Sequence, residues 1–221
     1  MKNSRIAVLS DFDCTISTIN VLSYLYECFD SSNWRTIVAR WDRGEISTPQ
    51  EIESCFASIH ATREEMEKSL DAVELDPAFK YLVQFCRSRK YYIAVASDGL
   101  RWYIEYILNR HKIHDVAIFA NEIHFTGNGY SFSYPWSNPS TPLRGTSKPA
   151  IIRRLQAEGK KVIFIGDGLS DVEAAEVADM VYASDILLEY TMKRDISSKP
   201  FAQLIEVVND LDRMFENLVT L

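Results

Sequence analysis

The chain has 221 residues, of which 47% are hydrophobic and 12% aromatic. This is enough apolar material to bury the core of one α/β domain with an insertion, or of two small domains. The formal net charge is −7 and the basic residues form no cluster. Nucleic-acid binding is therefore disfavoured, because affinity for a phosphate backbone requires concentrated positive charge.

The sequence also argues against a secreted or membrane protein. The first apolar run, Ile6–Leu9, is too short for the core of a signal peptide, and no later apolar stretch reaches the length of a membrane span. The cysteines, Cys14, Cys28, Cys55 and Cys86, show neither a CxxC pair nor metal-ligand spacing. We expect a soluble cytoplasmic protein that binds neither nucleic acid nor membranes.

The same run, Ile6–Leu9, predicts a first buried strand. Residues 19–76, which follow it closely, contain no comparable strand. They show helical patterns at 21–29, 34–40, 49–58 and 63–70. We predict a small helical cap inserted after the first strand and covering that strand's carboxyl end. This divides the chain into a catalytic core of residues 1–18 and 77–221 and a cap of residues 19–76.

Strands alternate with helices along the rest of the chain. The further predicted strands are 92–96, 116–119, 162–165 and 180–182, and the predicted helices are 77–88, 100–110 and 149–157. The strand segments are continuously apolar, as expected for strands that are covered on both faces. The pattern predicts an α/β fold with a Rossmann-like doubly wound parallel sheet.

Three segments complete the chain. Gly127, Asn128 and Gly129 predict a hairpin between 123–125 and 130–134. Residues 135–146, rich in Pro, Ser, Thr and Gly, predict a loop. Residues 204–221 form an amphipathic pattern that predicts a terminal helix packed on the core.

Paired carboxylates follow the first strand directly. Asp11 and Asp13 would point the same way if the strand continued through them. One of them could be a nucleophile, as Asp is in aspartyl-phosphate enzymes, and the other could pass a proton to a leaving oxygen. Taken alone, the motif is equally explained by a turn rich in capping residues.

A second acidic turn follows the predicted strand 162–165. Gly166 and Gly168 allow the backbone to approach a ligand, and Asp167 and Asp171 add two carboxylates. A strand-to-helix turn with Asp171 near the helix start is the alternative. Two acidic turns at the ends of buried strands favour a ligand site, because open α/β sheets bind ligands there and Mg²⁺ prefers oxygen ligands.

Two other motifs have ordinary explanations when taken alone. Ser97-Asp98-Gly99 could be a helix N-cap, and Lys148 could be a solvated surface lysine. Together with the acidic turns, however, they resemble the motif set of the haloacid dehalogenase superfamily of phosphohydrolases. The matching residues, in order, are Asp11-x-Asp13-x-Thr15, Ser97, Lys148 and Gly166-Asp167-x-x-x-Asp171. The helical insertion resembles the small cap of the phosphoserine-phosphatase-like branch.

The resemblance implies a role for each residue. Asp11 would be the nucleophile, and Asp13 would be first the acid and then the base. Ser97 and Lys148 would hold the phosphoryl oxygens. The implied Mg²⁺ ligands are Asp11, the backbone carbonyl of Asp13, and Asp167, with Asp171 supporting them. The expected substrate-binding residues are Thr15, Asn20, Asp98, Gly99 and Arg101.

The substrate is expected to be a small phosphorylated metabolite. Phosphoserine phosphatases carry Glu where this chain has Asn20 and an arginine where it has Cys55, although Arg101 matches a family arginine. The chain is also similar to the methionine-salvage phosphatases, with which it shares Tyr134-Pro135-Trp136 and residues 183–188, but it lacks their cysteine cluster before the lysine. Asn at the position of Asn20 is familiar in the similar phosphoethanolamine/phosphocholine phosphatases.

Two other functions are open to such a chain. A phosphotransferase or phosphomutase would use the same aspartyl-phosphate, but the small cap and the lack of an acceptor site disfavour it. A phosphate-sensing or scaffold protein would predict damaged motifs, and here every motif residue is intact. We therefore expect a Mg²⁺-dependent phosphatase that is a monomer or a homodimer.

Overall fold

The computed structural model describes residues 5–127 and 129–216, which form a seven-stranded sheet of order β4-β3-β2-β1-β5-β6-β7. All neighbouring pairs are parallel except β3 and β4. The strands are β1 Ile6–Ser10, β2 Tyr92–Leu100, β3 Ala117–Thr126, β4 Gly129–Ser133, β5 Lys161–Gly166, β6 Met180–Ala183 and β7 Lys199–Pro200. The predicted doubly wound α/β fold is confirmed.

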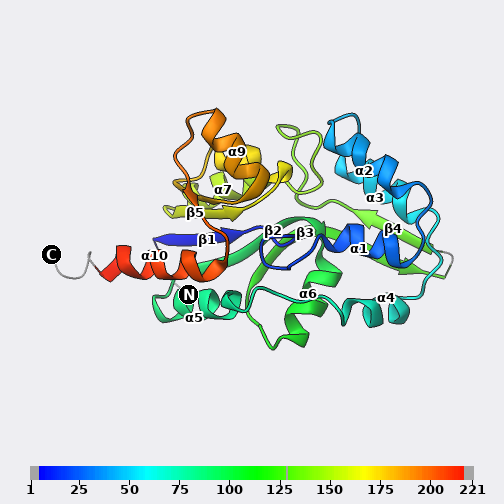
Figure 1. Cartoon of the computed structure of the whole chain (residues 1–221), viewed down its shortest axis with the longest axis horizontal. Helices are drawn as coiled ribbons and strands as arrows, with labels where there is room; N and C mark the ends of the chain where they lie inside the picture. Colours follow the sequence, from blue (N-terminus) through cyan, green and yellow to red (C-terminus); the bar gives the residue numbers. More distant parts are fainter. Residues whose placement is uncertain (1–4, 128, 217–221) are drawn as a thin grey trace.

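Helices cover both faces of this sheet. They are α1 Val21–Cys28, α2 Trp34–Asp42, α3 Thr48–Phe56, α4 Arg63–Leu70, α5 Ala78–Ser88, α6 Arg101–Arg110, α7 Lys148–Ala157, α8 Val172–Ala175, α9 Asp185–Lys193 and α10 Leu204–Glu216. Figure 1 shows α7 and α9 on one side of the sheet and α5, α6 and α10 on the other. Because helices cover both faces of the sheet, residues on both faces of each central strand are buried, which explains why the strand segments are continuously apolar.

Alternate residues of the central strands β1, β2, β5 and β6 enter different cores. Ala7 and Leu9 of β1 pack with Ile152 of α7, whereas Val8 joins the cluster that includes Phe79 of α5 and Leu211 of α10. This division follows from the two-residue period of a strand. The cluster on the α5 side also continues into residues of α1 and α3, so the inserted helices are packed onto the same core.

The inserted helices α1–α4 begin where the sequence supplies capping residues. Ser47 and Gln50 form a capping box at the start of α3, and Thr62 and Glu65 form another at α4. Asn20 caps α1 by accepting a hydrogen bond from the Ser23 amide at 2.9 Å. In Figure 1 these helices gather with β4 at one end of the molecule.

The strands β2 and β3 differ from their predicted lengths. β2 continues through Ser97-Asp98-Gly99 to Leu100, and its ladder with β3 shifts register between Ala96 and Leu100. The N-cap explanation of this motif is therefore wrong: Leu100 precedes α6, and it makes no side-chain cap. β3 is one continuous strand where a core strand and a hairpin strand were predicted separately, because it pairs with β2 and then with β4.

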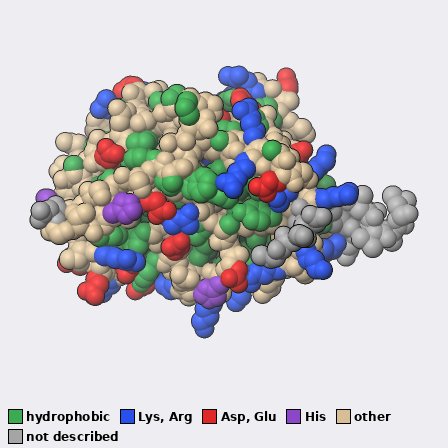
Figure 2. Space-filling model, turned by 180° about the vertical axis from the view of Figure 1, so that it is seen from behind, with side chains coloured by type: hydrophobic (Ala, Val, Ile, Leu, Met, Phe, Trp, Pro, Cys, Tyr) green, Lys and Arg blue, Asp and Glu red, His purple; other side chains and the backbone are tan. Residues whose placement is uncertain are grey.

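Near the end of the chain, α9 and β7 were not predicted, whereas α8 follows Asp171, where the alternative explanation of the second acidic turn placed a helix start. The predicted terminal helix is present as α10 up to Glu216, and its remaining residues lie outside those described. Figure 2 shows the face that is turned away from the viewer in Figure 1. Acidic and basic side chains are mixed over its described part, without a continuous patch of one sign. No described helix is long and apolar enough to cross a bilayer.

Candidate active site

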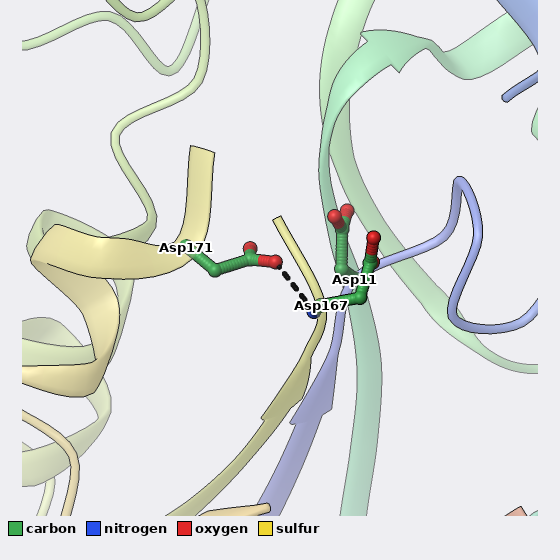
Figure 3. A group of neighbouring side chains, drawn as sticks. All are labelled: Asp11, Asp167 and Asp171. Atoms are coloured by element: carbon green, nitrogen blue, oxygen red, sulfur yellow. Dashed lines mark hydrogen bonds between the residues drawn. The ribbon is translucent and has the colours of Figure 1, made fainter. Parts of the chain in front are cut away.

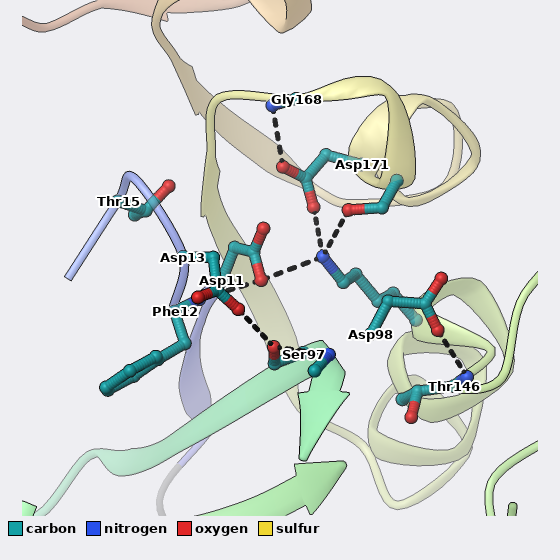
Figure 4. A network of polar contacts seen from close by, with 12 residues as sticks. Asp11, Phe12, Asp13, Thr15, Ser97, Asp98, Thr146, Gly168 and Asp171 are labelled. Carbon is teal, nitrogen blue, oxygen red and sulfur yellow. Dashed lines mark hydrogen bonds and ion pairs between the residues drawn. The ribbon is translucent and has the colours of Figure 1, made fainter. Parts of the chain in front are cut away.

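The sheet order brings the predicted motifs together. β1 lies between β2 and β5, so the carboxyl ends that carry Asp11, Ser97 and Asp167 are neighbours. Asp11 follows β1 directly, and its backbone amide donates to the Ile165 carbonyl of β5 at 2.9 Å. The edge where ligands bind in such sheets therefore holds the acidic residues of both turns (Figure 4).

Asp11 is 5% exposed and held in one orientation. Its Oδ1 accepts a hydrogen bond from the Phe12 amide at 2.7 Å and lies 2.9 Å from Lys148 Nζ. Burial, together with Asp171, raises the pKa of Asp11 well above its ordinary value, and Lys148 opposes this effect. The lysine is thus the group that favours the charged form of this carboxylate.

Lys148 is a buried lysine, and the interpretation of it as a solvated surface residue is wrong. Its side chain is 0% exposed and its Nζ lies 2.5 Å from Asp171 Oδ1, besides donating to Ser170 Oγ at 3.0 Å. Burial alone would lower the pKa of Lys148, but Asp11 and Asp171 raise it above its ordinary value. The ammonium group therefore stays charged between these two carboxylates.

Asp167 and Asp171 complete an acidic cluster with Asp11. One carboxylate oxygen from each lies within 4.8 Å of the others. Figure 3 shows Asp11 and Asp167 pointing to the same side and Asp171 reaching toward them. Asp171 Oδ2 accepts the amides of Asp167 and Gly168, both at 3.0 Å. Asp171 therefore shapes its own turn as well as binding Lys148.

The donor set fits a hard divalent cation. Both oxygens of Asp171 are engaged, whereas Oδ2 of Asp11 and Oδ2 of Asp167 accept no hydrogen bond from the described residues. Burial and Asp171 raise the pKa of Asp167 to about 7. Carboxylates that resist ionisation when close together are stabilised by a cation of this kind, for which oxygen ligands are preferred.

Asp13 lines the same cavity as Asp11. Its Oδ1 accepts the Val21 amide at 2.8 Å, and its Oδ2 accepts the Tyr103 hydroxyl at 2.7 Å and Ser97 Oγ at 3.4 Å. Burial raises the pKa of Asp13, and the hydrogen bond from Tyr103 lowers it. A carboxyl group with a raised pKa is suited to proton transfer near neutral pH.

Gly99 is required by this arrangement. A Cβ at Gly99 would lie 1.6 Å from the Tyr103 hydroxyl oxygen and 2.8 Å from Asp13 Oδ2. Only a residue without a side chain lets Tyr103 approach Asp13 across β2. Gly99 thus acts by making room for this hydrogen bond.

With Asp13 as the acid predicted from the sequence, replacing Tyr103 by Phe should lower kcat for phosphomonoester hydrolysis by about tenfold. This is the usual effect of losing a hydrogen bond to a charged group. Because that hydrogen bond stabilises the carboxylate, its loss raises the pKa of Asp13. An acid must be protonated to act, so the fall of kcat/KM on the alkaline side should move to higher pH. The measurement is a pH–rate profile, with Tyr106→Phe on the same helix as the control, since Tyr106 binds the remote Asp71. An unchanged profile would contradict the role of Tyr103.

The predicted substrate-binding residues differ in position. Asn20 and Gly99 line the same cavity as Asp11. Thr15 instead donates to Asp167 Oδ1 at 2.6 Å, so it orients a carboxylate. The structure does not bring Arg101 to the cavity lining: its Nε is 2.7 Å from Glu122 Oε1.

Asp98 lines the cavity and also links three segments. Its Oδ1 accepts the Thr146 amide at 2.7 Å, and its Oδ2 accepts Thr48 Oγ1 of α3 at 2.6 Å. Asn121 Nδ2 donates to its carbonyl at 2.6 Å. Asp98 therefore ties the inserted helices to the segment that leads into Lys148.

The cavity has a volume of about 210 Å³ and is lined jointly by the strand ends and the inserted helices. The inserted helices contribute residues that the sequence had not marked as functional. These are Leu22, Ser23, Val38, Trp41, Asp42, Thr48 and Glu51. Helical spacing alone could not distinguish them from packing residues, since their importance depends on which helix face meets the sheet edge.

A family model described as haloacid dehalogenase-like hydrolase matches residues 8–176. The chain belongs to the haloacid dehalogenase-like hydrolase family. The match extends from β1 through Asp171, so it includes every predicted catalytic and metal-binding residue. The predicted family and hydrolase class are confirmed.

Curated relatives in this family are similar over nearly their whole length. The 2-hydroxy-3-keto-5-methylthiopentenyl-1-phosphate phosphatase of Exiguobacterium sibiricum is 26% identical over 213 residues, covering 93% of this chain and 96% of the relative. That of Bacillus cereus (strain G9842) is 27% identical over 216 residues, covering 96% and 98%.

Solved structures of phosphoserine phosphatase share the fold. A substrate-bound complex superposes with a TM-score of 0.72 at 17% identity, covering 94% of this chain and 99% of the other. A phospho-aspartyl intermediate analogue gives a TM-score of 0.72 at 16% identity over the same shares. At this identity the likeness concerns the fold alone.

Proposed function

We propose that this chain is a Mg²⁺-dependent phosphatase that hydrolyses a small phosphomonoester through an aspartyl-phosphate on Asp11. One observation carries the proposal: Asp11 is held by a buried lysine and shares a cavity with a second carboxyl group, that of Asp13. A nucleophile, a compensating cation and a proton donor are the groups that two-step phosphate transfer requires.

In the first step, an oxygen of Asp11 attacks phosphorus and the bond to the leaving-group oxygen breaks. Asp13 donates its proton to that oxygen, so the leaving group departs as a neutral alcohol or enol. Lys148, 2.9 Å from Asp11, offsets the charge of the phosphoryl oxygens, and the hydroxyl of Ser97, next to Asp13, donates a hydrogen bond to one of them. The product of this step is the acyl phosphate on Asp11.

In the second step, Asp13 is a carboxylate and takes a proton from water, whose oxygen attacks the same phosphorus. The bond between phosphorus and Asp11 breaks, releasing inorganic phosphate and restoring the Asp11 carboxylate. Asp13 regains the proton it donated. Tyr103 keeps Asp13 oriented through both steps by its 2.7 Å hydrogen bond.

The residues that would hold Mg²⁺ are Asp11 and Asp167, with the carbonyl of Asp13 as a further oxygen. Asp171 would support them through the turn amides and Lys148. When bound, the ion supplies charge that lets an anionic phosphate enter a site lined by carboxylates.

For the substrate, we propose the compound in the names of the curated relatives, 2-hydroxy-3-keto-5-methylthiopentenyl-1-phosphate. The apolar side chains of Leu22, Val38 and Trp41 in the cavity favour a substrate with an apolar portion. Phosphoethanolamine or phosphocholine is the second candidate, supported by the two acids Asp42 and Glu51 in the same lining. The division into core and cap, the cytoplasmic location and the monomeric or dimeric state stay predictions.

The test is phosphate release from a panel of phosphomonoesters, with Mg²⁺ and after removal of metal by a chelator. The panel contains the methionine-salvage substrate, phosphoethanolamine, phosphocholine and phosphoserine. We expect release to fall at least about 100-fold without metal and to return with added Mg²⁺. Transfer of phosphate to an added alcohol instead of water would indicate a phosphotransferase. No metal-dependent release from any ester would overturn the proposal.

A further inference from the structure

The leaving-group side of the cavity has an unusual charge balance. Among its described lining residues there is no lysine or arginine, and the inserted helices contribute two acids, Asp42 and Glu51. Lys148 is fully engaged by Asp11, Asp171 and Ser170. Beyond the phosphate position, therefore, the described lining offers a substrate no basic side chain.

Glu51 is the more informative of the two acids. It lies on α3, is only 6% exposed, and lines the cavity while forming no ion pair with a described residue. The neutral hydroxyl of Tyr26 lies beside Glu51 and favours its charged form, although this buried hydroxyl meets full hydrogen-bond geometry with no described group. A buried carboxyl group whose described surroundings offer one neutral donor and no cation costs free energy, so it is retained only where something compensates.

The residue next to it in the lining has a defined structural task. Thr48 accepts a hydrogen bond from Trp41 Nε1 at 2.9 Å and donates to Asp98 at 2.6 Å. This chain of hydrogen bonds holds α2 and α3 against β2, which fixes the part of α3 that carries Glu51. Glu51 takes no part in it, so these hydrogen bonds between the helices and β2 do not explain its burial.

We propose that Glu51 is a substrate-binding residue that accepts a hydrogen bond from an ammonium or hydroxyl group on the leaving group, and that the substrate carries no carboxylate there. This inference rests on the proposed function and narrows the class of substrate that it allows. Leu22, Val38 and Trp41 would contact the carbon skeleton, and Glu51 would bind its one polar end.

The electrostatic surroundings agree with this geometry. Burial raises the pKa of Glu51 to about 8; the Tyr26 hydroxyl opposes this rise, and the acids Asp98, Asp13 and Asp42 add to it. In either protonation state the group keeps an oxygen that accepts a hydrogen bond. A carboxylate on the substrate would meet acids and no cation, which is a costly way to bury a charge.

Four small esters test the inference on the wild-type protein; three have a two-carbon chain, and phosphoserine extends this chain by a carboxyl carbon. Ethyl phosphate has no hydrogen-bond donor on its carbon chain, 2-hydroxyethyl phosphate has a hydroxyl, and phosphoethanolamine has an ammonium. Phosphoserine has both an ammonium and a carboxylate. We expect kcat/KM for at least one donor ester to exceed that for both ethyl phosphate and phosphoserine by about tenfold. Phosphoserine as the best of the four would overturn the inference while leaving the phosphatase proposal intact.

Substitution of Glu51 then separates the two kinds of donor. Glu51→Leu should lower the ratio of kcat/KM for the preferred donor ester to kcat/KM for ethyl phosphate by about tenfold, since ethyl phosphate reports any effect on folding and chemistry. Glu51→Gln keeps an acceptor but not a charge, so it should retain a hydroxyl substrate and lose an ammonium substrate. Glu53→Gln on the same helix is the matched control, because it faces Tyr134 and lies outside the cavity lining.

Two results would contradict the role of Glu51. An equal loss for ethyl phosphate and the donor esters would mean that the residue supports only the structure. Unchanged selectivity in Glu51→Leu would mean that it does not contact the substrate. If the wild type hydrolysed none of the esters in either panel, the proposed function would fail and this inference with it.

Discussion

Asp11→Asn should lower kcat for phosphate release by a factor on the order of 10⁴ or more, leaving turnover near background. The amide has nearly the shape of the carboxylate but is a poor nucleophile, so no acyl phosphate forms. The measurement combines steady-state phosphate release with acid quenching of a single turnover, which detects phosphate bound covalently to the protein. Wild type should show bound phosphate and Asp11→Asn none.

A matched control for this substitution is Asp195→Asn. Asp195 is exposed and has a φ of 54°, a conformation that Asn tolerates, and it lies outside the cavity lining. It should keep wild-type activity and covalent phosphate. Substantial turnover in Asp11→Asn, with phosphate still bound to the protein, would move the nucleophile to another residue.

Lys148→Met should lower kcat/KM by about 10³-fold. It should also lower the free energy of unfolding by about 3–5 kcal/mol near neutral pH. The lysine side chain is 0% exposed and lies between Asp11 and Asp171, so its loss leaves two buried carboxylates without their cation. The charge that favours ionised Asp11 and offsets an incoming phosphate is lost as well. Urea unfolding curves and kcat/KM measure the two effects separately.

The pH dependence of that destabilisation has a definite sign. Without Lys148 the pKa of Asp11, already raised by burial, rises further above its value in the unfolded chain. The folded state then holds more protons than the unfolded state, so the free energy of unfolding falls as pH rises. The variant should therefore lose more stability at pH 8 than at pH 5.

Two further variants test whether the uncompensated carboxylates cause the loss of stability in Lys148→Met. Lys161→Met replaces an exposed lysine at the start of β5 and should change little. Adding Asp171→Asn to Lys148→Met removes one uncompensated charge, so it should recover part of the stability without recovering activity. Wild-type stability in Lys148→Met would show that its contacts with the two carboxylates contribute nothing to the fold.

The elements of this fold could be read from contiguous residues. The apolar runs at 6–9, 92–96 and 162–165 and the capping residues of α3 and α4 are local signals, and the structure has strands and helices there. Asp11, Asp13 and Asp167 were also found locally, because each follows a strand directly. Their convergence followed from the rule that parallel strands end at one edge of the sheet.

Local signals failed where a residue's partner is distant in sequence. Tyr103 reaches Asp13 only because Gly99 leaves space for it, and Arg101 turns to Glu122 on the neighbouring strand. Ser97-Asp98-Gly99 extends β2 because that strand pairs with β3 through a shift of register, a property of two strands and not of one motif.

The sequence by itself determined the class of fold, the family and the chemistry of the acidic turns, because periodicity and short motifs are properties of neighbouring residues. Only the tertiary structure decided that Lys148 is buried between Asp11 and Asp171, and that Glu51 of α3 lines the cavity. Both depend on how elements far apart in the chain pack against one sheet edge. Packing of this kind assigns partners and burial, and these set the charge of each group and the substrate it can accept.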